Sequence, residues 1–189
     1  MNSKKVIGVT GEKASGKETW GDFLLEFLDV RGITHARVRS SDILKETLGI
    51  WNIPATRENL QTLPVGMESM FGTGVLTQAV KARIESIEAD VVVFDGIRWH
   101  SDLAMIRSFP DNLLIYVTAD INMRFERIRN RNDKVGELGL SFEQFMKEEN
   151  ASTEIYIPKI GKNADYTFEN NESVTDLFIK VREFYQSAM

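Results

Sequence analysis

The chain has 189 residues, a net charge of −5 and no cysteine, which suits a single domain over residues 1–189 and excludes disulfides and thiolate metal sites. We expect a cytoplasmic protein, because disulfide-free chains are typical of that compartment. We expect no nucleic acid polymer as a partner, since phosphate recognition needs a basic surface, and no membrane, since no apolar run approaches about 20 residues.

Short apolar runs alternate with amphipathic stretches along the chain, which predicts strands alternating with helices. The predicted strands are residues 6–10, 36–39, 91–95, 113–117 and 165–169. Apolar residues at steps of three and four predict helices between and after them. These helices are residues 17–28, a short one capped by Ser41 or Asp42, two pieces over 54–88 broken by Pro64 and by residues 72–74, then 122–131, 142–149 and 174–185. The alternation predicts an α/β fold with a mostly parallel sheet between helices.

The most specific motif follows the first predicted strand and opens the first predicted helix. It is the loop Gly11-Glu12-Lys13-Ala14-Ser15-Gly16-Lys17. Its glycines let the backbone wrap closely around phosphates, and the amides from about Ala14 to Thr19 point at the anion. Lys17 supplies a positive charge to the β- and γ-phosphates. The sequence therefore predicts an ATP site made by Gly11, Ala14, Ser15, Gly16, Lys17, Glu18 and Thr19.

One position departs from the general phosphate-loop motif. Glu18 stands where a serine or threonine usually binds Mg²⁺, and Thr19 follows it. In this the chain resembles nucleoside monophosphate kinases, whose loop reads Gly-Lys-Gly-Thr, and phage-type deoxynucleoside monophosphate kinases, which read Gly-Lys-Asp-Thr. The resemblance implies that the hydroxyl of Thr19 binds the metal. A glutamate in the first turn of a helix is also favoured by the helix dipole.

A second motif, Asp95-Gly96-Ile97-Arg98, closes the third predicted strand. A carboxylate there projects beside the phosphate loop, where it can hold a metal-bound water or orient the attacking oxygen. Arg98 can clamp an acceptor phosphate. The pattern resembles the acceptor loop of adenylate kinases and of dephospho-coenzyme A kinase-like proteins. The alternative is an ordinary turn, because Asp-Gly is common at strand ends.

Three arginines, Arg124, Arg127 and Arg131, recur at spacings that place them on one helix face. They resemble the arginines of the lid helix in the same kinases, so we expect a lid over residues 121–150. Arg127 and Arg131 would then stabilise the transferring phosphoryl group. Arg127 would also bind ATP, and Arg124 would contact the acceptor. The alternative is a solvated basic face.

In these kinases the segment after the second strand receives the acceptor, which implies residues 42–88 here. Asp42 and Arg57 are the candidate contacts, with a helix cap and a surface charge as the respective alternatives. Archaeal relatives often carry arginine at the position of Glu68, so one contact is expected to be missing. Asn170 lies in a stretch resembling the adenine loop of dephospho-coenzyme A kinase-like and archaeal adenylate-kinase-related proteins, although asparagine also favours a simple turn.

The order of these motifs resembles that of P-loop small-molecule kinases. The resemblance implies a three-layer α/β/α domain around a five-stranded parallel sheet of order 2-3-1-4-5, with a helical lid. It implies transfer of the γ-phosphoryl group of Mg²⁺-bound ATP to a small acceptor, foremost a nucleoside or deoxynucleoside monophosphate, by a monomer or homodimer. One alternative is a hydroxyl acceptor such as dephospho-coenzyme A, with Asp42 or Asp95 as base. Another is a regulatory ATPase without a small-molecule acceptor.

Overall fold

The computed structural model describes residues 4–130, 140–151 and 154–189, which fold around one five-stranded sheet. All neighbouring strands are parallel, in the order β2-β3-β1-β4-β5. The predicted parallel sheet and strand order are therefore confirmed. The strands are β1 (Lys5–Thr10), β2 (His35–Arg39), β3 (Val91–Ile97), β4 (Asp111–Thr118) and β5 (Tyr166–Glu169).

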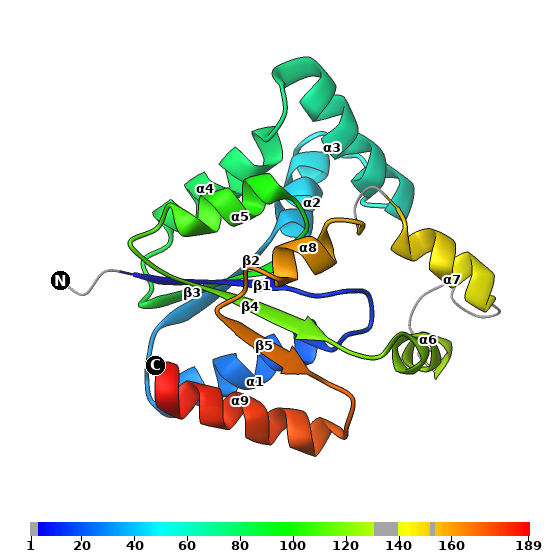
Figure 1. Ribbon diagram of the computed structural model, residues 1–189. Coiled ribbons are helices and arrows are strands. Elements are labelled where there is room, and N and C mark those ends of the chain that lie inside the picture. The colour runs from blue at the N-terminus through cyan, green and yellow to red at the C-terminus, as the bar shows by residue number, and fades with distance from the viewer. Residues whose placement is uncertain (1–3, 131–139, 152–153) are drawn as a thin grey trace.

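Helices cover both faces of the sheet, which gives the predicted three layers (Figure 1). One face carries α1 (Lys17–Val30) and α9 (Val174–Ala188), and the other carries α4 (Val75–Ser86), α5 (His100–Arg107) and α8 (Ile157–Gly161). Each face has its own buried core, because the side chains of a strand alternate between the two sides. Trp20 belongs to one core and Phe94 to the other. The continuous apolar run of β3 follows from this double burial.

The strand register brings the polar ends of β1 and β3 together. Val9 lies opposite Asp95, and Thr10 lies opposite Ile97 across an irregular step in the pairing. The hydroxyl of Thr10 donates to the carbonyl of Ile97 at 2.9 Å. All strands run in one direction, so the loops that follow β1, β3 and β4 gather at one edge of the sheet.

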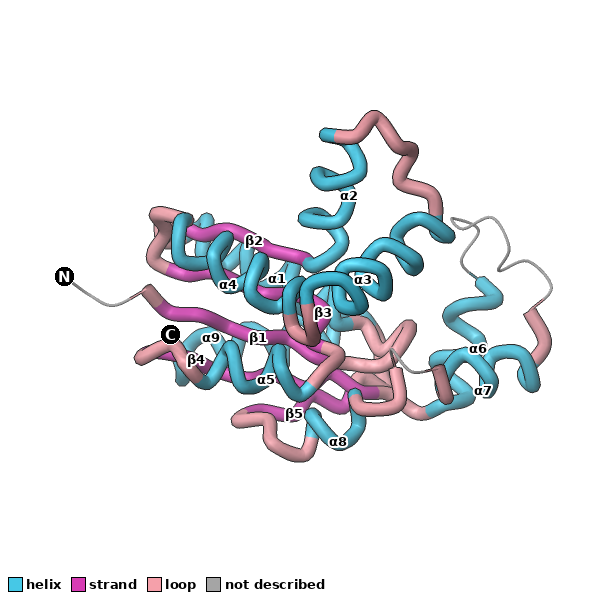
Figure 2. Tube along the Cα trace, turned by 90° about the horizontal axis from the view of Figure 1, so that it is seen from above, coloured by secondary structure: helices cyan, strands magenta, loops and turns pink. Residues whose placement is uncertain are grey.

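Two helices, α2 (Ser40–Ile50) and α3 (Arg57–Phe71), project from this edge of the sheet (Figure 2). The predicted capping role of Asp42 is wrong, because α2 already begins at Ser40 and Asp42 lies in its first turn. The predicted break at Pro64 is also wrong: α3 continues through it. A proline removes one backbone donor from a helix, and α3 tolerates this with no buried residue of its own. The break at residues 72–74 is confirmed, with Gly72 at φ 94° and Gly74 at φ 84°.

The helices α6 (Ile121–Asn130) and α7 (Phe142–Glu149) lie together beyond the carboxyl ends of the strands (Figures 1 and 2). Phe125 of α6 packs against Phe142 and Phe145 of α7, with ring centroids 5.2 and 5.5 Å apart. The predicted Arg131 lies outside the described residues. Within the described ranges, no helix is long and apolar enough to cross a membrane.

Candidate active site

The phosphate loop between β1 and α1 has a backbone that depends on its glycines. A Cβ atom on Gly11 would stand 2.3 Å from the carbonyl oxygen of Val117, which no side chain tolerates. Gly16 has φ 95° and Ala14 has φ 59°, both in the left-handed region. The amide of Ser15 donates to the carbonyl of Glu12 at 3.1 Å, which closes the turn. The loop therefore delivers the chain to the start of α1 with left-handed residues of the kind found in anion-binding backbone nests.

Asn170, which follows β5, supports the phosphate loop through hydrogen bonds. Its side-chain amide donates to the carbonyl of Ser15 at 2.8 Å, and its backbone amide donates to the carbonyl of Thr118 at 2.8 Å. A Cβ atom on Gly16 would lie 2.2 Å from the same side-chain nitrogen, so the two residues fit each other closely. Asn170 thus supports the loop structurally. Its contact with adenine stays a prediction.

Two donors of the loop have no protein partner within the described residues. The hydroxyl of Ser15 is buried without a hydrogen bond, and Lys17 is half-buried without an ion pair to any described residue. Burial lowers the pKa of Lys17, and the charge of Asp95 opposes that shift. Unpaired donors at a helix N-terminus fit an anion such as a polyphosphate.

Asp95 follows the apolar run of β3 and is 6% exposed. Its carboxylate accepts a hydrogen bond from the Nε of Arg39 at 3.3 Å, since the two residues are partners in the strand register. Thr19 lies in the first turn of α1. Arg39 was not predicted as a site residue. It is the last residue of β2, and polar residues at the carboxyl ends of parallel strands are candidates for a site, which is the rule that identified Asp95.

The loop after Asp95 is fixed by a buried carboxylate. Asp102, 1% exposed, accepts hydrogen bonds from the backbone amides of Arg98 and Trp99 at 3.1 and 3.2 Å. It also accepts one from the hydroxyl of Thr77 at 2.8 Å. Burial raises the pKa of Asp102. This arrangement positions Arg98, whose guanidinium pairs with Glu154.

The predicted acceptor residues on α2 and α3 lie at the surface. Asp42 pairs with Lys45 at 3.4 Å, and Arg57 is exposed at the first position of α3. Among the described residues, no hydrogen bond or ion pair joins either of them to the phosphate loop. Glu68 accepts a hydrogen bond from the backbone amide of Gly74 at 3.3 Å, so it helps to close the end of α3.

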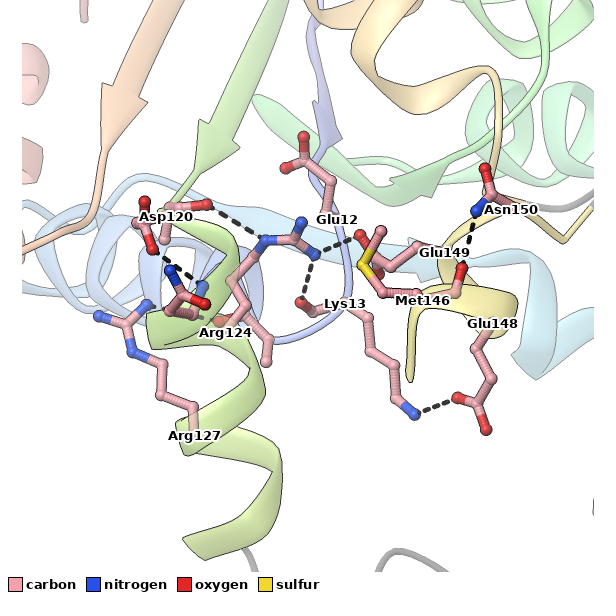
Figure 3. Close-up of polar contacts among 12 residues, drawn as sticks. Glu12, Lys13, Asp120, Arg124, Arg127, Met146, Glu148, Glu149 and Asn150 are labelled. Carbon is pink, nitrogen blue, oxygen red and sulfur yellow. Dashed lines mark hydrogen bonds and ion pairs between the residues drawn. The ribbon is translucent and has the colours of Figure 1, made fainter. Parts of the chain in front are cut away.

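Arg124 and Arg127 of α6 both reach the phosphate loop (Figure 3). Arg124 donates to the carbonyl of Lys13 at 3.3 Å and to the carboxylate of Glu149 at 2.6 Å. Arg127 donates to the carbonyls of Ala14 at 3.4 Å and of Asn170 at 2.8 Å. At 5% exposed, Arg124 faces inward and links α6, α7 and the loop. Arg124 and Arg127, two of the three arginines predicted to share a helix face, therefore lie against the phosphate loop.

A group of carboxylates beside the loop was missed by the sequence reading. The hydroxyl of Tyr116 donates to Glu12, and burial together with this bond raises the pKa of Tyr116 to about 12. Burial also raises the pKa of Glu149. Glu12, Glu149 and Glu154 line a cavity of about 180 Å³. A larger hollow of about 630 Å³ runs along β5 and α9, and none of the predicted site residues lines it.

Comparison with known sequences finds similarity to archaeal proteins that carry the name UPF0200 protein. The one from Methanoculleus marisnigri is 29% identical over 128 residues, 67% of each chain. The one from Sulfurisphaera tokodaii is 26% identical over 184 residues, 97% of each chain. No protein-family model matches the sequence.

Comparison with solved structures finds P-loop kinases. Shikimate kinase from Bacteroides thetaiotaomicron superposes with a TM-score of 0.63 at 13% identity, over 96% of this chain and 98% of that one. Shikimate kinase from Acinetobacter baumannii, solved in complex with shikimate, gives a TM-score of 0.58 at 18% identity, over 98% and 94%. The chain thus has the fold of P-loop kinases, and the resemblance to P-loop small-molecule kinases predicted from its motifs is confirmed at the level of the fold.

Proposed function

We propose that this protein is an ATP-dependent phosphotransferase that acts on a small acceptor, foremost a nucleoside or deoxynucleoside monophosphate. The observation that carries the proposal is the phosphate loop, where the hydroxyl of Ser15 and the ammonium of Lys17 are unpaired among the described residues. Asp95 lies within electrostatic reach of that lysine. The proposal includes a cytoplasmic location and a monomer or homodimer.

Bound Mg²⁺-ATP would supply the phosphoryl group for transfer. The amides of residues 14–19 and the ammonium of Lys17 bind and orient its phosphates. The hydroxyl of Thr19 and the carboxylate of Asp95 fit Mg²⁺, which takes one or two protein oxygens and keeps phosphate and water ligands besides. Arg127, already against the loop at the carbonyl of Ala14, stabilises negative charge on the transferring group. We assign the same role to Arg131.

The acceptor is proposed to bind between Arg98 and the α2–α4 segment. Arg98 and Arg57 are the cations for its phosphate, and Asp42 is a candidate for its polar groups. Arg124 also supports the phosphate loop from inside, because its Nε and Nη1 donate to Ala119, Lys13 and Glu149. Its contact with the acceptor stays a proposal, for which its Nη2 donors serve. A monophosphate attacks through an oxygen that is already ionised, so positioning and charge neutralisation suffice.

A second candidate function is ATP hydrolysis without a small-molecule acceptor, in the manner of a regulatory ATPase. The ion pair between Glu154 and Arg98 favours it, because it neutralises the arginine that a phosphate acceptor requires. Measuring ADP yield with and without a panel of monophosphates and hydroxyl acceptors separates the two. Stimulation by an acceptor supports the transferase, and an unchanged slow rate supports the ATPase.

The test of nucleotide turnover is the substitution Lys17→Ala. We expect ADP formation to fall by about 10² or more, because the lysine supplies the charge on the β- and γ-phosphates. Lys81→Ala on α4 is the matched control, since Lys81 is 42% exposed and pairs only with Glu85 among the described residues. Thermal melting verifies folding. Near-normal turnover in a folded Lys17→Ala protein would rule out the phosphotransferase and the ATPase alike.

A further inference from the structure

Arg39 is a cation at the carboxyl edge of the sheet that the proposed transfer leaves without a role. It is the last residue of β2, and α2 begins with the next residue. In the strand register it is the partner of Asp95 on β3, and Arg98 follows Asp95 by three residues. Arg39 therefore adjoins both the loop that carries Arg98 and the start of α2, which are the two borders of the proposed acceptor site.

The guanidinium of Arg39 lies on the side of the sheet that carries α1. Successive residues of a strand face opposite sides. Val93 packs in the core that contains Trp20 of α1, so Asp95, two residues later, faces the same side. The Nε of Arg39 donates to Asp95 at 3.3 Å, which places the guanidinium there as well. Lys17 opens α1 on this side, and the charge of Asp95 reaches it.

Only part of the guanidinium of Arg39 is engaged by the protein. Its Nε bonds Asp95, whereas neither of its Nη nitrogens makes a hydrogen bond or ion pair with a described residue. The side chain is 37% exposed, and neither Nη nitrogen is buried. Arg37, two residues earlier on the same strand, differs because its Nη1 bonds Asp22 and its unpaired Nε and Nη2 are buried. Arg39 can therefore bind a further anion through its Nη nitrogens.

A phosphate monoester fits this part of the guanidinium. The Nη nitrogens present coplanar N–H donors, and arginine binds phosphate oxygens through parallel pairs of such bonds. A phosphate that approaches Asp95 also needs a cation beside it, because two anions repel each other. Arg98 is paired with Glu154, and no hydrogen bond or ion pair between described residues brings Arg57 to the phosphate loop. Arg39 supplies a cation that already contacts Asp95.

We propose that Arg39 binds the phosphate of the acceptor through its two Nη nitrogens while its Nε keeps the bond to Asp95. Arg98 contacts the same phosphate from the loop that follows β3. The inference rests on the proposed function and narrows its substrate class to acceptors whose attacking group is a phosphate, because an uncharged hydroxyl gives the arginine no anion to bind.

Methyl phosphate tests this contact, since it carries the phosphate of a monophosphate and little else. The full chain is first saturated with Mg²⁺ and the non-hydrolysable ATP analogue AMP-PNP, so that the phosphate loop is filled. In ligand-observed NMR titrations we expect Arg39→Gln to weaken methyl phosphate binding by about tenfold or more and to leave AMP-PNP binding unchanged. Arg31→Gln is the matched control, because Arg31 is exposed at the C-terminal end of α1, whereas Lys17 opens that helix.

Arg39→Lys keeps the charge and loses the paired donors, so we expect its affinity for methyl phosphate to fall between those of the wild type and Arg39→Gln. Thermal melting verifies that each variant folds, and Arg39→Lys serves alone if Arg39→Gln does not fold. A folded Arg39→Lys chain that binds methyl phosphate as tightly as the wild type overturns the paired contact.

The Asp95→Asn background separates phosphate binding by Arg39 from simple neutralisation of Asp95. If Arg39 binds the phosphate directly, Arg39→Gln weakens methyl phosphate binding in this background by about the same factor as in the wild type. If Arg39 only neutralises Asp95, the effect disappears with the carboxylate, which overturns the proposal. Equal binding by the wild type and Arg39→Gln overturns it as well.

ADP formation separates failure of this inference from failure of the proposed function. Suppose that monophosphates stimulate Lys17-dependent ADP formation and that Arg39→Gln changes neither methyl phosphate binding nor the KM of the acceptor. The role of Arg39 alone is then overturned. Methyl phosphate binding that depends on Arg39, in a chain that forms no ADP with any acceptor, overturns the proposed function instead. A chain that binds no AMP-PNP overturns both.

Discussion

The pairing of β1 with β3 places the carboxylate of Asp95 beside the phosphate loop. It lies opposite Val9 in the register, immediately before the phosphate loop begins, and it is 6% exposed. Its one hydrogen bond to a described residue comes from Arg39 at 3.3 Å, which leaves its other oxygen for further ligands. A buried carboxylate next to a cation remains able to accept, so it suits a metal or its bound water.

We expect Asp95→Asn to raise the Mg²⁺ concentration needed for half-maximal turnover and to lower kcat by about 10². Asp90→Asn is the matched control, because Asp90 precedes the other end of β3 and its side chain bonds only Thr34 among the described residues. Magnesium titrations of ADP formation measure both variants. If the acceptor is a hydroxyl and Asp95 its base, the acidic limb of the kcat profile also disappears. An Asp95→Asn protein with unchanged kcat and Mg²⁺ dependence would remove Asp95 from the mechanism.

Tyr116 affects stability through its bond to Glu12. Tyr116→Phe leaves a buried carboxylate oxygen without a donor, so we expect a loss of about 1–3 kcal/mol in the free energy of unfolding at neutral pH. The pKa of Tyr116 is about 12 in the fold against 10.0 ordinarily. Between these values the unfolded chain has released the proton and the folded chain has kept it, so stability falls as pH rises. The wild-type advantage over Tyr116→Phe should therefore shrink from pH 10 upward in urea titrations. A constant difference would contradict this assignment.

At the scale of elements, α6 acts through the face that it turns to the phosphate loop. Arg124 and Arg127 donate to the carbonyls of two successive loop residues, Lys13 and Ala14. Arg129 follows Arg127 by two residues and so lies on the opposite side of the helix. It pairs with Glu126 and is 57% exposed. The helix thus carries two arginines that contact the phosphate loop and one exposed arginine that pairs within the helix.

We expect Arg127→Ala to lower kcat for ADP formation by about 10², the scale of one lost charge-stabilising contact. Arg129→Ala, the matched control on the same helix, should leave kcat unchanged, since an exposed ion pair contributes little. Steady-state kinetics over a range of ATP concentrations separates kcat from KM. A rise in KM alone for Arg127→Ala would identify a binding residue instead.

The helices and strands that were predicted correctly are those with a clear local sequence pattern. Apolar runs and steps of three and four located the strands and most helices, and the glycine-rich loop located the phosphate site. Pro64 was misjudged because an exposed helix absorbs one lost hydrogen bond. The helices α5 and α8 were both missed, and α8, with five residues, offered too few turns for a periodic signal. Contacts such as Arg98 with Glu154 join residues 56 positions apart, and no local pattern reports them.

For the whole molecule, a single sheet is shared by two cores. The core that contains Trp20 is formed by α1 and α9 on one face, and the core that contains Phe94 is formed with α4, α5 and α8 on the other. Neither core is complete without the strands that lie between them. The helices α2 and α3 of the proposed acceptor segment and the helices α6 and α7 of the proposed lid lie toward the same edge of the sheet (Figure 1).

We expect one cooperative unfolding transition for the whole chain, because both cores lose their support when the sheet separates. Far-UV circular dichroism and tryptophan fluorescence should give coincident urea curves, since Trp20 is fully buried against Phe168 and Phe184. Two separated midpoints would show that part of the chain unfolds on its own.

The hydrogen bond from Asn170 to Ser15 joins residues 155 positions apart. Proteins are synthesised from the N-terminus, so the phosphate loop leaves the ribosome among the first segments and Asn170 among the last. A nascent chain that ends before β5 has the loop but lacks the residue that holds it. If the proposed function holds, we expect nucleotide binding to arrive late in synthesis, so that a chain terminated before β5 neither captures ATP nor gains the stability that a bound ligand gives the folded state.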